Sequence, residues 1–592
     1  MNTKLAIAHL PATLLTASVA LTSLALLGAG CTGSDVGSDD LDAASIPYAD
    51  GSPEGRAILD VANDRDLDVT AYDDVVGLHK KAAENLIEHR DRDPNTDADD
   101  NPFDDLSELW TVSYCKTTCF NKLLDYAKAT GVYGGNENVS VVFSPQPSES
   151  THLQKIADWI DDEVDETIDI AMYSYSHSNP VRGALERAVA RGVKVRFLAD
   201  DGVADSASKA GGLEEMGIDV RRVTKVMHHK FAIIDGPRDD STLDRAATAH
   251  IITGSGNWSS SAGTIYDENT LYLTAYPELA LRMQRDFDTI WAGSKDKVYN
   301  DSLEWDQTRA DISDALIAQH EDDNTHAWFT SFNFKSNSNQ SWSYLGTTHV
   351  TDQIVAGILG ADESLEIATG HFVSLPIAQA VEDALSANPN LSVRVVIDCQ
   401  EVNKNDDGIG TIKKNIENLG GRITYKCNTY RWHYKYAKQM HHKYVIVDGD
   451  ELYTGSLNFS DNSETNVFEN VLYFSGAEHR SLLDAYQANF EMVSTYGQEN
   501  DGAAYDAVME EIETGDFIPL VWDPAITMSA DDFDVLKDAI RDNCPATVTW
   551  VQNPAEGAET YDALVQDQPH WFTHCARNGY PWPNVPQHMR VD

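Results

Sequence analysis

The sequence predicts an α/β protein with two tandem halves, residues 137–298 and 326–495, each an α/β/α sandwich and related by pseudo-two-fold symmetry. Two observations support this fold class. Apolar, strand-like runs alternate with amphipathic helical segments in each half, and this alternation places helices on both faces of a sheet. The second half also repeats the order and spacing of the polar motifs of the first, which indicates an internal duplication.

Hydrophobic periodicity defines the elements of each half. In the first half we expect strands at 139–143, 168–173, 193–199 and 231–234, with helices at 153–164 and 184–190. In the second half we expect strands at 365–369, 393–397 and 444–447, with helices at 354–358 and 377–385. Because strands that are joined through helices usually run parallel, we expect each sheet to be largely parallel.

Composition limits the classes of function. The 592 residues are 42% hydrophobic, which is enough apolar surface for globular cores and excludes a fibrous or wholly disordered chain. The 95 acidic residues outnumber the 44 basic ones, for a formal charge of -51. A field of this sign repels nucleic acid and anionic membranes, so any polyanion has to be bound in a local basic pocket.

The first thirty residues have the character of an export signal, with Lys4 followed by an apolar stretch and small residues. The segment Leu27–Cys31 resembles a bacterial lipobox, although Gly28 replaces the usual leucine, and the resemblance implies lipidation of Cys31. A plain cleaved signal is the alternative. We therefore expect an exported protein, periplasmic or on the cell surface, with a lipid anchor in a bacterial outer membrane.

The regions that flank the two halves differ from them in composition. Residues 31–53 form a flexible linker rich in Gly, Ser and Asp. Residues 54–132 show helical spacing and resemble tandem helix-hairpin-helix modules, which implies a possible contact with nucleic acid; a helical packing module is the alternative. Residues 499–592 form an acidic, Trp- and Pro-rich accessory region to which we assign no chemistry.

The candidate catalytic residues form a motif that occurs twice, 213 positions apart. Its two copies are His228, Lys230 and Asp235 in the first half and His441, Lys443 and Asp448 in the second. Residues i and i+2 of a strand face the same side, so each histidine and its lysine can project together toward one cavity. One copy alone would be an ordinary coincidence, whereas two complete copies point to a site.

Each copy is followed by the same downstream residues at the same spacing. The serine and asparagine of a Gly-Ser-x-Asn segment are Ser255 and Asn257 in one half and Ser456 and Asn458 in the other. A Glu-Asn pair then begins 13 residues after each serine, at Glu268 and Glu469. Packing alone does not account for identical spacing in both halves.

These residue types suit a phosphodiester. Two imidazoles supply a nucleophile and a general acid, while two ammonium groups neutralise two non-bridging oxygens. The asparagines and serines donate to the remaining lone pairs, and a carboxylate at the far nitrogen of each imidazole orients it. We expect Glu268 and Glu469 to take this last role. Since no cluster with metal-ligand spacing accompanies the motif, we expect neither a metal nor a cofactor.

Both halves resemble the phospholipase D superfamily, whose signature is a duplicated HKD motif, over residues 137–495. The resemblance implies a two-step reaction through a phosphohistidine, in which His228 is the nucleophile and His441 the acid and base. It further implies that the lysines and asparagines of the motifs bind phosphate oxygens. For Asp235 and Asp448 it implies an orienting or structural role.

The resemblance leaves the substrate open. We expect hydrolysis of a glycerophospholipid head group at a membrane surface, with transfer to an alcohol as a variant of the second step. The alternatives are a metal-independent nuclease acting on DNA or RNA, which the net charge opposes, and a non-catalytic surface binding protein, which would need a lost catalytic residue. None of the six HKD residues is missing.

Two further expectations concern loops and cysteines. The halves differ in having 18 residues between Asp235 and Gly254 but 6 between Asp448 and Gly455, and we expect the longer loop to shape substrate access. Excluding Cys31 leaves six cysteines, which in an exported chain favours disulfides. Neighbourhood suggests the pairs Cys399–Cys427 and Cys544–Cys575, whereas Cys115 and Cys119 either pair or bind a metal.

Overall fold

The computed structural model divides the chain into two units, residues 1–45 and 46–592, and all the described residues belong to the second. Described are residues 48, 53–65, 67–90, 102–103, 105–130, 138–177, 180–206, 208–296, 303, 306–402, 408–429, 438–494, 503–514 and 521–542. The predicted signal segment, Cys31 and the pair Cys544–Cys575 lie outside these residues.

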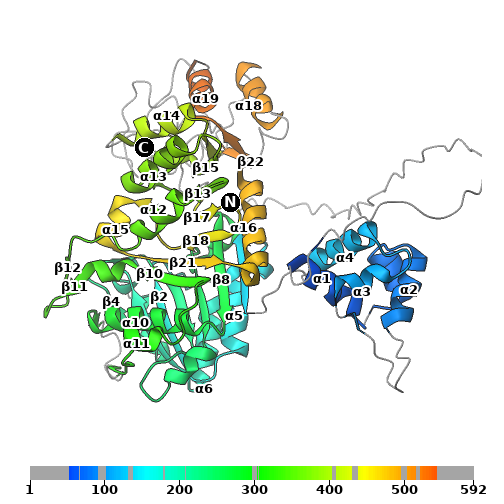
Figure 1. The fold of residues 1–592 in the computed structure, drawn as a ribbon. Coiled ribbons are helices and arrows are strands. Elements are labelled where there is room, and N and C mark those ends of the chain that lie inside the picture. Colours follow the sequence, from blue (N-terminus) through cyan, green and yellow to red (C-terminus); the bar gives the residue numbers. More distant parts are fainter. Residues whose placement is uncertain are drawn as a thin grey trace, which may run out of the picture. The chain divides into compact units, whose positions relative to one another are not determined.

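A helical module precedes the two halves (Figure 1). Its α-helices are α1 (Pro53–Asn63), α2 (Lys80–Arg90), α3 (Leu106–Thr111) and α4 (Thr117–Thr130), with a π-helical turn at Ala71–Val75. These helices enclose an apolar core of their own that includes Ile58, Leu86 and Leu123. Cys115 and Cys119 form a disulfide, which decides between the two alternatives for them.

The strands of the first half form an eight-stranded sheet of order β1-β8-β7-β6-β2-β3-β4-β9 within the described residues. They are β1 (Val139–Ser144), β2 (Thr167–Met172), β3 (Lys194–Ala199), β4 (Asp219–Arg222), β6 (Lys230–Ile234), β7 (His250–Gly254), β8 (Glu268–Thr274) and β9 (Lys295–Asp296). The helices are α5 (His152–Asp162), α6 (Pro180–Arg191), α7 (Asp201–Ala204), α8 (Ala210–Met216), α9 (Ser260–Thr264) and α10 (Pro277–Ala292). Apolar residues of α5, α6 and α8 cover one face of the sheet.

The second half repeats this sheet in the order β10-β21-β18-β17-β13-β15-β16-β22. Its strands are β10 (Thr325–Phe329), β13 (Ser364–Thr369), β15 (Ser392–Asp398), β16 (Arg422–Thr429), β17 (Lys443–Val447), β18 (Glu451–Gly455), β21 (Asn470–Ser475) and β22 (Val521–Met528). Its helices are α12 (Thr351–Leu359), α13 (Leu375–Ala387), α14 (Ile409–Asn418), α15 (Asp461–Asn466) and α16 (Arg480–Ser494). In the region after residue 499, β22 pairs with β16, and it lies in the chain between α18 (Ala503–Thr514) and α19 (Ala530–Asp542).

The expectation of largely parallel sheets is wrong, because both sheets are mixed. In the first half β2, β3 and β4 are parallel neighbours, and helices α6 and α8 make the crossovers between them. By contrast β6, β7, β8 and β1 pair antiparallel. Antiparallel neighbours need no crossover helix, and short connections such as the turn between β17 and β18 suffice. The α/β class with tandem sandwich halves is confirmed.

The two halves share one apolar core. Phe287 of α10 and Phe490 of α16 belong to the same cluster, which receives side chains from both sheets. Helix α16 also lies against β1 of the first half (Figure 1). The short strands β5 (Val226–Met227) and β20 (Val467–Phe468) pair parallel across the halves. Met440, just before the second motif, forms a parallel bridge with Asp267 of the first half, so the segment that leads into each His–Lys motif is held by the opposite half. None of the helices in the described part of the chain combines the length and apolar character that a membrane span requires.

Candidate active site

Both motif histidines are fixed by the backbone of the opposite half. His228 follows β5 directly, and its amide N–H donates to the carbonyl of Phe468 at 2.9 Å. The amide of His441 donates to the carbonyl of Asp267, also at 2.9 Å. Each of these carbonyls precedes the glutamate of its own half, so the same pairing that positions the histidine also delivers a carboxylate to it.

The histidine–glutamate pairs cross between the halves. Nδ1 of His228 lies 2.9 Å from the carboxylate of Glu469, and Nδ1 of His441 lies 2.8 Å from Glu268. Both glutamates are fully buried. A carboxylate at Nδ1 keeps the proton on that nitrogen and leaves Nε2 as the reactive one. Each histidine is therefore paired with a carboxylate from the opposite half.

A second pair of histidines repeats the crossing. Nδ1 of His229 lies 3.2 Å from the side-chain oxygen of Asn470, and Nδ1 of His442 lies 3.3 Å from the amide of Asn269. Sequence reasoning missed these four residues as a structural group. A signal for them is present in the sequence, because the whole His-His-Lys segment and the whole Glu-Asn segment occur in both halves. The HKD motif itself includes one of the two histidines of each His-His-Lys segment.

The two motif lysines are buried beside the histidines. Nζ of Lys230 donates to the carbonyl of His228 at 2.6 Å, and Nζ of Lys443 donates to that of His441 at 2.7 Å. Burial lowers the pKa of Lys230 to about 7 and that of Lys443 to about 8, against the opposing pull of Glu469 and Glu268. An anionic ligand would offset this desolvation and restore both charges.

Burial also changes the protonation of the histidine–glutamate pairs. It holds the pKa of His228 and of His441 well below the usual value, and the charges of Lys230 and Lys443 add to the effect. Burial raises the pKa of Glu268 and of Glu469 to about 7. The charge of His228 contributes to the lowered pKa of His441, so the two imidazoles lie within electrostatic range of each other. In the free site both imidazoles are therefore neutral at pH 7.

Within each copy the serine and the asparagine have different surroundings. Ser255 accepts the amide of Asn269 at 2.9 Å, and Ser456 accepts that of Asn470 at 3.0 Å. Hydrogen bonds from these serines also lower the pKa of the neighbouring glutamates. Each serine thus contacts the carboxylate of the glutamate in its own half. The side-chain oxygens of Asn257 and Asn458 are buried without a hydrogen-bond partner among the described residues.

The motif aspartates lie at the opposite ends of β6 and β17 from the histidines. Asp235 and Asp448 have left-handed backbone conformations, with φ of 48° and 52°. Asp235 accepts three consecutive backbone amides at 165–167, at 2.7 to 2.8 Å. Asp448 accepts those at 362–364, at 2.6 to 2.9 Å. The structure therefore separates the aspartates from the His–Lys cluster and places them in the turns that start β2 and β13.

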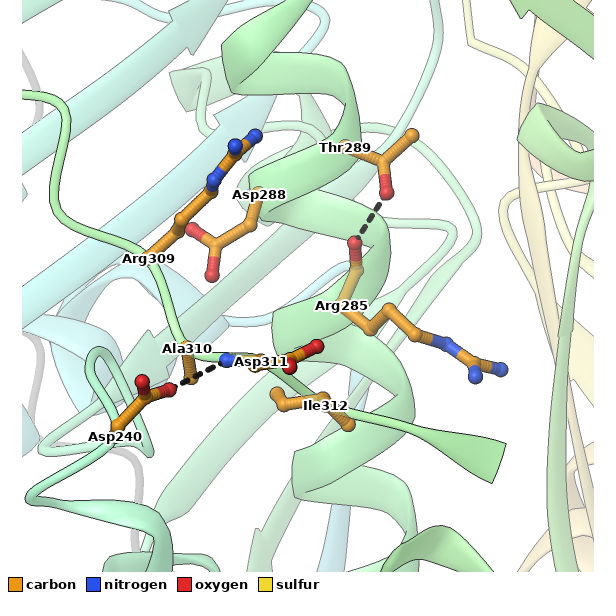
Figure 2. A pocket seen from close by; sticks show the side chains of 8 residues that line it. All are labelled: Asp240, Arg285, Asp288, Thr289, Arg309, Ala310, Asp311 and Ile312. Carbon is orange, nitrogen blue, oxygen red and sulfur yellow. Dashed lines mark hydrogen bonds between the residues drawn. The ribbon is translucent and has the colours of Figure 1, made fainter. Parts of the chain in front are cut away.

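The expectation that the longer loop shapes substrate access is wrong. This loop follows Asp235, at the end of the sheet away from His228, and Arg238 in it is buried against Asp169 and Asp306 at 3.4 and 3.2 Å. The loop packs on the chain between the halves, because Asp240 accepts the amide of Asp311 at 2.7 Å (Figure 2). A cavity of about 450 Å³ lies between them and α10.

A group of three acids at the edge of the first sheet has atoms close enough to hold a metal ion: Glu214, Asp219 and Asp296. Arg221 already occupies this group, with guanidinium nitrogens 2.9 Å from both Asp219 and Asp296. The guanidinium supplies the positive charge that these carboxylates need. The group comes from α8, β4 and β9, whereas the His–Lys cluster precedes β6 and β17.

Comparison with known proteins agrees with this geometry. The family described as cardiolipin synthase, PLD-like domain, matches residues 162–291 and 354–493, one region in each half. Each half therefore contains a phospholipase D-like domain.

Curated relatives include several proteins named mitochondrial cardiolipin hydrolase. The one from Danio rerio is 32% identical over 132 residues, or 22% of this chain and 52% of the relative. The one from Chlamydomonas reinhardtii is 30% identical over 161 residues, or 27% of this chain and 64% of the relative. The chain thus spans between half and two thirds of these relatives. The solved phosphatidylserine synthase of Haemophilus influenzae has 12% identity and a TM-score of 0.42, over 60% of this chain and 86% of that one.

Proposed function

We propose that the protein is a phosphodiesterase of the phospholipase D type that cleaves the head-group ester of a phospholipid. The observation that carries this proposal is the reciprocal pairing of His228 with Glu469 and of His441 with Glu268, with a buried lysine beside each histidine. Two oriented imidazoles and two ammonium groups in one cluster match the needs of a phosphodiester with one negative charge.

In the first step Nε2 of His228 attacks phosphorus, and the new P–N bond replaces the P–O bond to the departing alcohol. His441, charged when the anionic substrate raises its pKa, gives its Nε2 proton to the alkoxide. Lys230 and Lys443 neutralise the non-bridging oxygens, and the amides of Asn257 and Asn458 are placed to donate to them. Glu469 stabilises the positive imidazole that forms on His228.

In the second step water gives a proton to His441 and attacks phosphorus, and the P–N bond breaks. The products of the whole cycle are a phosphomonoester and an alcohol, formed from a phosphodiester and water. An alcohol in place of water would give a new phosphodiester by the same proton transfer. Every proton transferred in this cycle moves through His441, while His228 forms and breaks the bond to phosphorus.

The names of the family and of the curated relatives, which refer to cardiolipin, support a phospholipid substrate. The strong negative charge of the chain favours zwitterionic over anionic bilayers. The test is to incubate the protein, in EDTA, with phosphatidylcholine vesicles and with cardiolipin vesicles, and to measure head-group or phosphatidic acid release. We expect release that His228→Ala abolishes. No release from either lipid by the wild type would refute the proposal.

A metal-independent nuclease is the second candidate, favoured by the backbone of the helical module. Gly77 and Tyr114 have φ of 78° and 68°, so equivalent left-handed turns lead into α2 and α4. Turns of this kind agree with the tandem hairpins that the sequence suggests. Incubation with single- and double-stranded DNA under the same conditions distinguishes the candidates, because cleavage of DNA without lipid hydrolysis would support the nuclease. Cleavage of neither would leave the binding protein.

We also propose that the protein is exported and anchored through a lipid on Cys31. The character of residues 1–31 supports this, and so does the predicted Cys399–Cys427 disulfide, which is present in the structure, because structural disulfides persist in oxidising compartments. Labelling cells with radioactive palmitate should mark the wild type and not Cys31→Ala. Equal labelling of the two, or none of the wild type, would contradict the anchor.

A further inference from the structure

A third histidine–glutamate pair lies in the second half, outside the duplicated motif. Nδ1 of His371 is 2.8 Å from Oε1 of Glu401. Glu401 is fully buried, whereas 38% of the His371 side chain is exposed. The arrangement has the same form as the two motif pairs, with Nδ1 on a buried carboxylate. Within the described chain the Nε2 atom of His371 has no hydrogen-bond partner, so it is available to a ligand.

Strand register identifies the residues at the equivalent places of the first half. Met172 pairs with Lys230 as Thr369 pairs with Lys443, so Ser174 is the counterpart of His371. Met172 likewise pairs with Ala199 as Thr369 pairs with Ile397, so Val203 is the counterpart of Glu401. A serine and a valine form no such pair. The third pair therefore distinguishes the second half from the first.

The residue before His371 adds a second difference. Its first-half counterpart is Tyr173, whose ring lies 4.5 Å from the ring of His228, centroid to centroid, and 5.1 Å from Nζ of Lys230. In the second half this position is Gly370. A Cβ atom there would lie 3.0 Å from the carbonyl oxygen of Met440, 3.6 Å from Cα of His441 and 3.8 Å from its Cδ2, so the glycine is closely packed against this backbone. A tyrosine thus covers one imidazole, and the other is left uncovered at the matching position.

His371 is also held close to His441. The amide of Gly370 donates to the carbonyl of His442, which fixes the backbone next to the motif. The charge of His371 contributes to the lowered pKa of His441. On the other side, Glu401 ends the short helical turn Cys399–Glu401, and the Cys399–Cys427 disulfide ties the start of this turn to β16. The pair is therefore a rigid feature on the His441 side of the site.

We propose that His371, held by Glu401, hydrogen-bonds the alcohol that leaves phosphorus, so that the second half forms a leaving-group subsite. This inference rests on the phosphodiesterase function proposed above. The acid His441 must reach the leaving oxygen, so the alcohol lies on that side, where Gly370 has no side chain to cover the imidazole as Tyr173 covers His228. Nε2 of His371 contacts the alcohol through a hydrogen bond. His371 neither gains nor loses a proton over the cycle. Its hydrogen bond affects the selectivity of the enzyme for the leaving alcohol.

The test compares two leaving groups on the full-length protein. Bis(p-nitrophenyl) phosphate releases p-nitrophenolate, which departs without a proton. The alkyl ester is phosphatidylcholine in vesicles, or a single-stranded DNA oligonucleotide if the wild type cleaves that instead. We expect His371→Ala to lower kcat/KM for the alkyl ester about 10-fold or more and to change it less than about 3-fold for the aryl ester. Glu401→Gln should shift selectivity in the same direction.

Two control variants sharpen the result. Ser174→Ala, the matched change in the first half, should leave both rates unchanged. His371→Gln, whose side-chain amide nitrogen can take the place of Nε2, should recover part of the alkyl-ester rate. If the melting temperature of His371→Ala differs from that of the wild type, the His371→Gln variant is used for the test instead. Equal losses on both esters in folded variants, or no loss on either, would overturn the inference alone. Failure of the wild type to cleave any alkyl ester would overturn the proposed function as well.

Discussion

In the first half the ring of Tyr173 lies against His228. In the second half Gly370 and the His371–Glu401 pair lie beside His441 instead. In other respects the halves match closely. Each supplies a buried lysine, a buried glutamate and an asparagine whose side-chain oxygen has no hydrogen-bond partner in the part of the chain that the structure describes. The residues that we propose to bind the phosphate are therefore symmetric, and the halves differ in the residues beside the two histidines. This comparison teaches that the two histidines have matching lysine and glutamate partners but different neighbouring residues.

The largest expected effect comes from removing each histidine in turn. His228→Ala and His441→Ala should each lower kcat on phospholipid by about 10⁴-fold, because neither step proceeds without its imidazole. On bis(p-nitrophenyl) phosphate the two variants should differ. His441→Ala should release p-nitrophenolate in a burst and then stall as a phosphohistidine, since the aryl group leaves without an acid, and His228→Ala should give no burst.

Stopped-flow absorbance with phosphohistidine detection by mass spectrometry makes this measurement. If His228→Ala instead gave the burst and a phosphohistidine at residue 441, the roles of the two histidines would be reversed. The reciprocal pairing of histidines and glutamates would still hold.

The next effect tests the crossing between the halves. Glu469→Gln should impair the step that His228 performs, and Glu268→Gln the step that His441 performs, with losses in kcat of about 10²- to 10⁴-fold. The Glu469 variant should therefore lose the burst on the aryl ester, while the Glu268 variant should keep it. If each glutamate instead affected the histidine of its own half, the reciprocal pairing would be incorrect.

A smaller effect concerns pH. The charge of Lys230 lowers the pKa of His228, and the nucleophile must be unprotonated to attack. Activity therefore persists below the ordinary pKa of histidine and is lost as pH falls through the lowered value. Lys230→Met removes the neighbouring charge, so the acid limb of kcat/KM, which reports protonation of the His228–Glu469 pair, should move to higher pH. An unmoved limb on the aryl ester would show that the lysine acts on the substrate alone.

The smallest expected effect is on stability. Hydrogen bonds from three backbone amides hold the pKa of Asp448 below its usual value although burial opposes them, so the stability it contributes is present above its unfolded pKa and is lost as pH falls through the folded pKa. Asp448→Asn keeps the left-handed turn and removes the charge. It should lower the free energy of unfolding by about 1–2 kcal/mol at pH 7, measured in urea, with kcat nearly unchanged. A large loss of kcat at unchanged stability would place Asp448 in the chemistry.

The sequence predicted the parts of this molecule that depend on local spacing. Hydrophobic periodicity gave the strands that follow His228 and His441, and the repeated motif gave their lysines and glutamates. The direction of strand pairing was not predictable from the hydrophobic pattern of the strands. Helical crossovers join the parallel strands and short turns, such as the one between β17 and β18, join antiparallel strands, but the strands themselves have the same pattern in both cases. The exchange of glutamates was also hidden, since Glu469 and His228 are 241 positions apart.

Residues without a repeated partner were the hardest to find. His371 is a single histidine with no equivalent in the first half, so a search for duplicated motifs passes over it. Asp235 and Asp448 repeat together with the histidines and lysines, and the structural role that the resemblance implies for them agrees with their hydrogen bonds to the turns at the other ends of the strands. Repetition in a sequence identifies what both halves need, for folding or for chemistry, and does not separate the two.

The central claim is that one imidazole and one ammonium group from each half surround a single phosphorus atom. A crystal structure of the protein with orthovanadate, which mimics phosphorus at its transition state, tests this most directly. The account predicts one vanadate with its metal atom bonded to Nε2 of His228, and with Nε2 of His441, Lys230 and Lys443 all contacting its oxygens. Vanadate bound in one half without the other, or in two separate places, would contradict it.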